Sequence, residues 1–233
     1  MDIYSFFPAR QNFTDLPLAL RQEKRQSISL IDLDLIEQAL QSDEALFLQQ
    51  LLSASEQDYF QRFKYIKRKK EWLGGRIAAK AALLALTGTV IDSSENPSSD
   101  RNPRSISILP DTHGRPGIEE FPINLFAQGS SRLKISLSHS DHFAVALARA
   151  ESSCGIDLQE ISVKLAGLTD HFATDAELYL LAEQADCDED TRLTMLWNVK
   201  EALKKAFLHD QAVIFSETEL REINLISDSL RSF

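Results

Sequence analysis

The chain has 233 residues, of which 43% are hydrophobic and 26% are charged, as is usual for a globular protein. This length allows one large domain or two compact lobes. The net charge of −10 argues against a general affinity for nucleic acid or for an anionic membrane. Cys154 and Cys187 lie far apart and lack metal-ligand spacing, which argues against a zinc site and a disulfide framework.

The sequence shows neither a secretory signal nor a membrane span. The first 25 residues contain no basic stretch followed by an apolar core. The apolar run from Ala78 to Val90 is interrupted by Lys80 and Gly88 and is too short to cross a bilayer. We therefore expect a cytoplasmic protein that does not enter membranes.

The expected elements of the first 150 residues mix helices and strands. Residues 1–26 give no clear pattern, and residues 91–104, rich in Ser, Asn, Asp and Pro, are expected to form an exposed loop. Ser53 has the character of a helix N-cap, with Glu56 in the first turn behind it. Apolar periodicity predicts strands over 27–33, 105–109, 133–137 and 143–148, and helices over 35–52 and, with a break, from 54 to 86.

One stretch of this first part is strongly basic. Only one acid, Glu71, accompanies eight basic residues there, namely Arg62, Lys64, Lys67, Arg68, Lys69, Lys70, Arg76 and Lys80. The run Lys64–Lys70 can be a solvated helix face. Arg76 and Lys80 differ, because they lie four residues apart in an apolar stretch, where burying a cation is costly unless an anion faces it. A localised anionic ligand or partner is expected here.

In the second part, the stretch Cys154–Gln159 predicts a buried strand that ends at Asp157. Helices are predicted over 174–183 and 190–208. Glu201 and Lys205 lie four residues apart and therefore share one helix face. From the residues alone, Asp157 could equally be a polar residue that hydrogen-bonds a turn, and the Glu–Lys pair could be an ordinary surface pair.

Four short motifs together resemble a known family. They are Gly114-Arg115-Pro116, Ser136-Leu137-Ser138-His139-Ser140, Gly155-Ile156-Asp157, and the Trp197–Lys205 segment with Lys200, Glu201 and Lys205. In this order they resemble the 4'-phosphopantetheinyl transferases, specifically the larger, two-lobed (surfactin-synthetase-activating type) group. The resemblance runs from about residue 27 to residue 206.

The resemblance implies an activity. Such enzymes transfer 4'-phosphopantetheine from coenzyme A to a serine of an apo acyl or peptidyl carrier protein and release 3',5'-adenosine bisphosphate. It implies a Mg²⁺ ion held by Asp157 and Glu201, with Gln159 as a further candidate ligand. Glu201 would be the general base, and Asp157 and Lys205 would complete the catalytic set. Many members carry a second carboxylate where this chain has Gln159, so that position departs from the common pattern.

The resemblance also implies a set of coenzyme A contacts. Ser138 and His139 would contact a phosphate, Arg115 and Pro116 would lie near the adenine and the 3'-phosphate, and Lys205 would hold the diphosphate. Together with the cationic positions discussed above, the expected coenzyme A contacts are Arg76, Lys80, Arg115, Pro116, Ser138, His139, Lys200 and Lys205.

The expected fold is α+β, with two pseudo-symmetric α/β lobes and the active site between them. We place the lobes at residues 1–150 and 151–233, the second being short, and expect a monomer. A faint internal repeat supports two lobes. At a common spacing of 125 residues (157 − 32), Asp32 aligns with Asp157, Trp72 with Trp197, Arg76 with Glu201, and Lys80 with Lys205.

Three functional alternatives follow from the sequence. The first is the active transferase, in which the basic run also attracts an acidic carrier protein. The second is a catalytically degenerate module that binds coenzyme A or the carrier protein, which Gln159 and the short second lobe favour. The third is a nucleic-acid-binding protein that uses the basic helix; the acidic remainder of the chain and the few aromatic residues near that helix argue against it.

Overall fold

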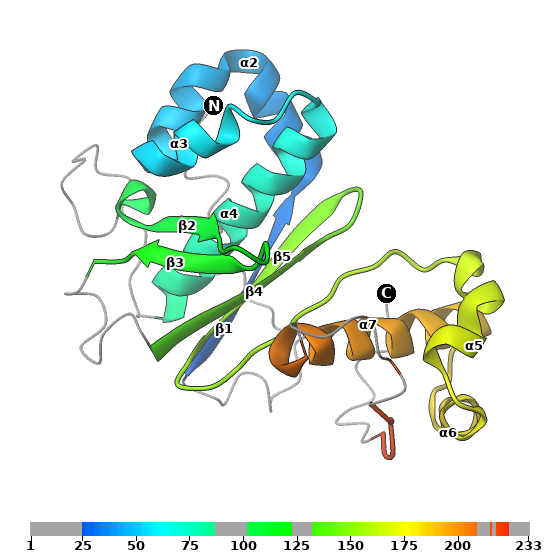
Figure 1. Cartoon of the computed structure of the whole chain (residues 1–233). Helices are drawn as coiled ribbons and strands as arrows, with labels where there is room; N and C mark the ends of the chain where they lie inside the picture. The colour runs from blue at the N-terminus through cyan, green and yellow to red at the C-terminus, as the bar shows by residue number, and fades with distance from the viewer. Residues whose placement is uncertain (1–24, 87–101, 123–131, 209–214, 216–217, 224–233) are drawn as a thin grey trace.

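The computed structural model of the chain describes residues 25–86, 102–122, 132–208, 215 and 218–223. Its first part is built on a three-stranded antiparallel sheet in the order β1 (Gln26–Asp32), β5 (Phe143–Ala150), β4 (Leu133–His139). Two long helices, α2 (Leu33–Leu51) and α4 (Ile66–Leu86), belong to the same body, and α4 packs against all three strands. Figure 1 shows α4 crossing the sheet.

A second, smaller sheet lies beside α4. It is a hairpin of β2 (Ser107–Pro110) and β3 (Pro116–Glu120), preceded by the 3₁₀ turn η2 (Pro103–Ser105). Gly114, in the turn between the strands, has φ +82°, a backbone conformation that residues with a side chain rarely adopt. Pro103 is the first residue of η2, a position at which a backbone N–H has no hydrogen-bond partner within the helix.

The part that follows β5 contains helices and an extended connection. After β5 the chain continues without a strand to η5 (Val163–Leu168), and then forms α5 (Thr169–Phe172), α6 (Asp175–Gln184) and α7 (Glu189–Phe207). The predicted strand over Cys154–Gln159 is therefore wrong, because among the described residues no neighbouring strand pairs with this stretch. The other predicted helices and strands are found within a few residues of their expected bounds.

The apolar residues form two separate cores. The larger core extends from Ile31 to Ala150 and joins the sheet to α2, α3 (Ala54–Phe60) and α4. The smaller core extends from Leu165 to Phe215 and is centred on the aromatic rings of Phe172, Trp197 and Phe215. The mixed helix and strand content agrees with the predicted α+β class. No helix among the described residues is long and apolar enough to cross a membrane.

Both cores contain the same buried polar device. Ser53 and Glu56 form a capping box at the start of α3, and Thr174 and Glu177 form one at the start of α6. Each glutamate is fully buried and is paired with a buried lysine of the following long helix. Glu56 binds Lys80 of α4 at 2.5 Å, and Glu177 binds Lys200 of α7 at 2.9 Å.

Each of these glutamates also holds a distant backbone segment. The Ile108 N–H donates to Glu56 Oε1 at 3.0 Å, and the Leu220 N–H donates to Glu177 Oε1 at 2.8 Å. The lysines add a bond to a carbonyl, Lys80 to Leu51 O and Lys200 to Phe215 O. Each pair thus joins a short helix, a long helix and a third segment at one buried point.

Breaking the second pair is expected to destabilise the protein strongly. The substitution Lys200→Met removes the cation and leaves the Glu177 carboxylate buried without a counter-charge, a change that costs about 3–5 kcal/mol. Urea denaturation measures the loss. Arg221→Gln, which removes the exposed ion pair of Arg221 with Glu219, is the control and should cost less than about 1 kcal/mol. An equally small loss for Lys200→Met would contradict this account.

Candidate active site

Three segments of the chain meet at the ammonium group of Lys205. This lysine lies in the last turns of α7 and donates to Asp157 Oδ1 at 2.6 Å. It also donates to the carbonyl of Ile156 at 3.1 Å and to the carbonyl of Leu137, in β4, at 3.2 Å. The contact therefore joins the second helical part to the edge strand of the main sheet, and the predicted pairing of Asp157 with the α7 motif in one site is present.

The close approach of the Gly155 backbone to α7 makes this contact possible. A Cβ atom built on Gly155 would lie 1.8 Å from the carbonyl oxygen of Ala202, far inside any allowed contact. Only glycine can let the connection run so near the helix backbone. Asp157, two residues further on, is thereby brought to the helix face that carries Lys205.

Two serines of β4 hold the other side of the 155–157 segment. Ser138 Oγ donates to Asp157 Oδ1 at 2.7 Å, and Ser136 Oγ accepts the N–H of Ile156 at 3.1 Å. Residues two apart in a strand project to the same face, so both hydroxyls are directed to this segment. Ser136 belongs to the predicted motif, although only Ser138 and His139 were expected to act.

Glu201 lies one helical turn before Lys205 on the same side of α7. Its side chain is 20% exposed, and its carboxylate is 3.9 Å from the ammonium group of Lys204. Asp157 and Glu201 thus bring two carboxylates to this end of the molecule, from different elements. Within the described ranges, no group of three or more His, Cys, Asp or Glu side chains is arranged to hold a metal.

A cavity of about 630 Å³ opens beside Lys205. One wall is the β2–β3 hairpin with Arg115 and Pro116, and another is formed by β4 and by Cys154. The turn of the hairpin is fixed by Asp111, whose Oδ1 accepts the N–H groups of His113 and Arg115. These hydrogen bonds lower the pKa of the Asp111 carboxyl and keep it ionised. The structure brings Arg115, Pro116 and Lys205 to one cavity, as the motifs predicted.

His139, at the end of β4, faces the start of α4. Its Nε2 lies 4.0 Å from Glu71 Oε2, and Glu71 also binds Arg68 at 3.1 Å. Burial lowers the pKa of His139, and the nearby Glu71 opposes that shift. Glu71 is therefore a residue near the candidate site that the sequence reasoning did not assign. The available signal was its position as the one acid within a basic run.

Two lysines and one arginine that were predicted to contact coenzyme A are instead buried in the protein interior. The side chains of Lys80 and Lys200 are 0% and 3% exposed, and each is paired with an internal glutamate. Arg76 is also buried, donates to Ile108 O at 3.3 Å and stacks over the ring of Trp72. Its burial lowers the pKa of the guanidinium to about 10. The anions that face Lys80 and Lys200 are thus glutamates of the protein, and the described geometry leaves these two lysines no surface for a ligand.

The remaining expectations concern exposed residues. Gln159 is exposed, beyond the segment that α7 and β4 hold. The basic run at the start of α4 is paired with acids of its surroundings. The pairs are Lys67 with Asp141, Arg68 with Glu71, Lys69 with Glu44, and Lys70 with Asp34 and Glu37. The predicted patch of uncompensated positive charge is therefore largely neutralised.

Comparison with known proteins places the chain in a family. No family model matches it. It is 33% identical over 104 residues to a holo-[acyl-carrier-protein] synthase of Petrotoga mobilis, which covers 79% of that protein and 43% of this chain. It is also 33% identical over 125 residues to the synthase of Pelodictyon phaeoclathratiforme, which covers 95% of that protein and 53% of this chain.

A solved structure also matches part of the chain. The crystal structure of a holo-(acyl-carrier-protein) synthase from Bacillus anthracis in complex with CoA (3',5'-ADP) is 27% identical, with a TM-score of 0.43. The match covers 96% of that chain and 55% of this one. The sequence identity to these two synthases shows that the chain belongs to the holo-[acyl-carrier-protein] synthases, which are 4'-phosphopantetheinyl transferases. The predicted family is confirmed, whereas membership of the larger, two-lobed group stays a prediction.

The packing of Gly155 against α7 gives a testable prediction. In Gly155→Ala the new methyl group would overlap the Ala202 carbonyl. The 155–157 segment must therefore move away from α7, which separates the Asp157 carboxylate from the Lys205 ammonium group. We expect a loss of about 1–3 kcal/mol in urea denaturation, with a clear loss of enzymatic activity. Gly167→Ala is the matched control, because nothing lies within 4 Å of its added Cβ. Equal behaviour of the two variants would contradict the proposed contact.

Proposed function

We propose that the chain transfers 4'-phosphopantetheine from coenzyme A to a serine of an apo carrier protein. The observation that carries the proposal is the Lys205–Asp157 contact, which holds a carboxylate against an ammonium group that lines a cavity. The family membership supports the same reaction, because the relatives are named as holo-[acyl-carrier-protein] synthases.

Coenzyme A would occupy the cavity between the hairpin and β4. A volume of about 630 Å³ is within the usual range for small-molecule sites, and Arg115 and Lys205 offer positive charge on two of its sides. A guanidinium suits both stacking on a base and pairing with a phosphate, so Arg115 would face the nucleotide end. Lys205 would then hold the diphosphate, and Ser138 and His139 would contact a phosphate near Asp157.

The carboxylates of Asp157 and Glu201 would hold Mg²⁺. Their oxygens are the ligands that this hard cation prefers, and with only two carboxylates the diphosphate and water must complete the shell. When bound, Mg²⁺ would supply charge neutralisation to the diphosphate. Gln159 could contribute only a carbonyl oxygen or hold a water, without adding negative charge.

The incoming nucleophile would be the serine hydroxyl of the carrier protein. Glu201, directly or through a water, would accept its proton as the serine oxygen attacks the phosphorus attached to pantetheine. The bond from that phosphorus to the leaving 3',5'-adenosine bisphosphate breaks in the same step. Lys205 would offset the charge that collects on the diphosphate.

We further propose that residues 1–150 and 151–233 are two related lobes of one monomer. The support is the repeated device of a capping box, a buried glutamate and a buried lysine, described above. These devices align Glu56 with Glu177 at a spacing of 121 (177 − 56) and Lys80 with Lys200 at 120 (200 − 80). These spacings are four and five residues shorter than the register of 125 residues expected for the helices.

A transfer assay tests the proposed function. Wild-type protein with coenzyme A and Mg²⁺ should add one phosphopantetheine to an apo carrier protein, detected by intact-protein mass spectrometry. Glu201→Gln keeps the shape of the side chain but cannot accept the proton, so the rate should fall by about 10²–10⁴-fold. EDTA should abolish the transfer. Binding of coenzyme A without any transfer to several carriers would instead indicate the catalytically degenerate module.

The location of carrier docking can be tested by charge reversal. Lys67 and Arg68 are 66% and 58% exposed, close to His139, although each has an acidic neighbour. The double variant Lys67→Glu/Arg68→Glu should raise KM for an acidic carrier by about tenfold or more at low salt, with the difference shrinking as salt increases. Arg221→Glu, on an exposed side chain of the second part, is the control. An unchanged KM for the carrier would exclude this docking surface.

The other expected properties remain proposals. The partners would be coenzyme A and the carrier protein, with no nucleic acid and no membrane. The net charge of −10 and the internal pairing of the basic run both support this assignment. The cytoplasm is the proposed location.

A further inference from the structure

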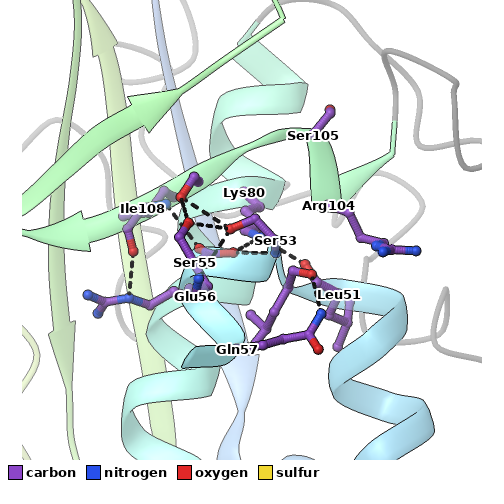
Figure 2. Close-up of polar contacts among 12 residues, drawn as sticks. Leu51, Ser53, Ser55, Glu56, Gln57, Lys80, Arg104, Ser105 and Ile108 are labelled. Atoms are coloured by element: carbon purple, nitrogen blue, oxygen red, sulfur yellow. Dashed lines mark hydrogen bonds and ion pairs between the residues drawn. The ribbon is translucent and has the colours of Figure 1, made fainter. Parts of the chain in front are cut away.

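The buried Glu56 carboxylate joins α3, α4 and β2 at one point. Its Oε2 accepts from the Ser53 N–H at 2.9 Å and from Lys80 Nζ at 2.5 Å, and its Oε1 accepts from the Ile108 N–H at 3.0 Å. Figure 2 shows these side chains converging from the two helices on the start of the hairpin. Glu56 and Lys80 are both 0% exposed, so no water or ligand competes for these bonds.

The peptide groups around Ile108 are held by two charged side chains. The Ile108 N–H is bound by Glu56, and the Ile108 carbonyl accepts from Arg76 Nε at 3.3 Å. The neighbouring Ser107 adds hydroxyl contacts to Ser53 at 3.1 Å and to Ser55 at 2.9 Å. This set of bonds, drawn in Figure 2, anchors β2 to α3 and α4.

The anchored strand carries one wall of the cavity. In the β2–β3 register, Ile108 is opposite Ile118, which lines the cavity, and the turn that follows β2 supplies Asp111 and Arg115 to the same wall. The position of the wall therefore depends on where Ile108 is held. A hairpin of two short strands has little stability of its own, so its position depends on contacts with the rest of the protein.

We propose that the Glu56–Lys80 pair, together with Arg76, is a positioning device that fixes the hairpin wall and so sets the affinity of the cavity for its ligand. The identity of that ligand as coenzyme A rests on the proposed function, whereas the position of the hairpin does not. Arg76 and Lys80 then act on binding without touching the ligand. Both are positioning residues.

Two double variants separate this role from general stability. Lys80→Met with Glu56→Gln removes the charges but keeps an oxygen that can accept the Ile108 N–H. Lys80→Met with Glu56→Leu removes the acceptor as well. Exchange of a buried ion pair for apolar residues of similar size is commonly tolerated, so both proteins are expected to fold. They differ in the one bond that holds β2.

The readouts are the Kd for coenzyme A by calorimetry and the hydrogen exchange of residues 107–120. Because the Ile108 N–H loses its acceptor, the Glu56→Leu/Lys80→Met protein should bind about tenfold more weakly than the Glu56→Gln/Lys80→Met protein and exchange faster over the hairpin. Its kcat at saturating coenzyme A should change less than its KM. Leu181→Ala, which weakens the second core, is the stability control and should leave exchange over the hairpin unchanged.

Equal Kd values and equal hairpin exchange in the two double variants would overturn the proposal. If wild-type protein does not bind coenzyme A at all, the proposed function fails, and the exchange experiment alone decides the positioning role. If the Glu56→Leu/Lys80→Met protein does not fold, Arg76→Met takes its place, because it removes the bond to the Ile108 carbonyl and leaves the ion pair intact. Hairpin exchange at the wild-type rate in that variant would then overturn the proposal.

Discussion

The contact between Lys205 and Asp157 depends on how closely a backbone can approach α7. The 155–157 segment has no strand partner among the described residues, so its place is set by contacts with α7 and β4. Gly155 lies against the Ala202 carbonyl, the Ile156 N–H binds Ser136, and Asp157 binds Lys205 and Ser138. Every other feature of the candidate site is arranged around this segment. Glu201 is one helical turn before Lys205 on α7, and Lys205 itself lines the cavity.

Buried ion pairs hold the elements that frame this segment. An isolated charge in a protein interior is costly, but a pair with further hydrogen bonds can be accommodated and then fixes geometry. Glu56 and Lys80 do this beside the hairpin, and Glu177 and Lys200 do it beside α7. Each glutamate is at the third position of its helix, where it also binds the N-cap backbone. One side chain thus closes a helix end and joins two other segments.

The elements and the motif residues could be predicted from the sequence, but the roles of the buried cations could not. Strand alternation and helix periodicity are local, so β1, β4, β5 and the long helices were found. The reasoning that Lys80 requires an anion was sound, yet the anion is Glu56, 24 residues earlier in the chain, and Arg76 binds the Ile108 carbonyl and the ring of Trp72. The sequence next to a buried lysine does not show whether its counter-charge comes from a distant residue of the protein or from a ligand. The 154–159 segment has the apolar pattern of a strand, but its contacts with α7 and β4 are side-chain hydrogen bonds and the close approach of Gly155, not strand pairing.

The proposed alignment of the two buried pairs leaves Glu201 and Lys205 without counterparts in the earlier helix. Aligning Lys80 with Lys200 sets Ala81 at the position of Glu201 and Ala85 at the position of Lys205. The earlier helix thus keeps the lysine that holds the fold and lacks both side chains proposed for proton transfer and diphosphate binding. At the spacing of 125 residues expected from the sequence, Asp32 aligns with Asp157; in the structure it is the N-cap of α2, where it accepts the N–H groups of Asp34 and Leu35. In the proposed function, residues 1–150 therefore supply Ser138, His139 and Arg115, and residues 151–233 supply the carboxylates of Asp157 and Glu201.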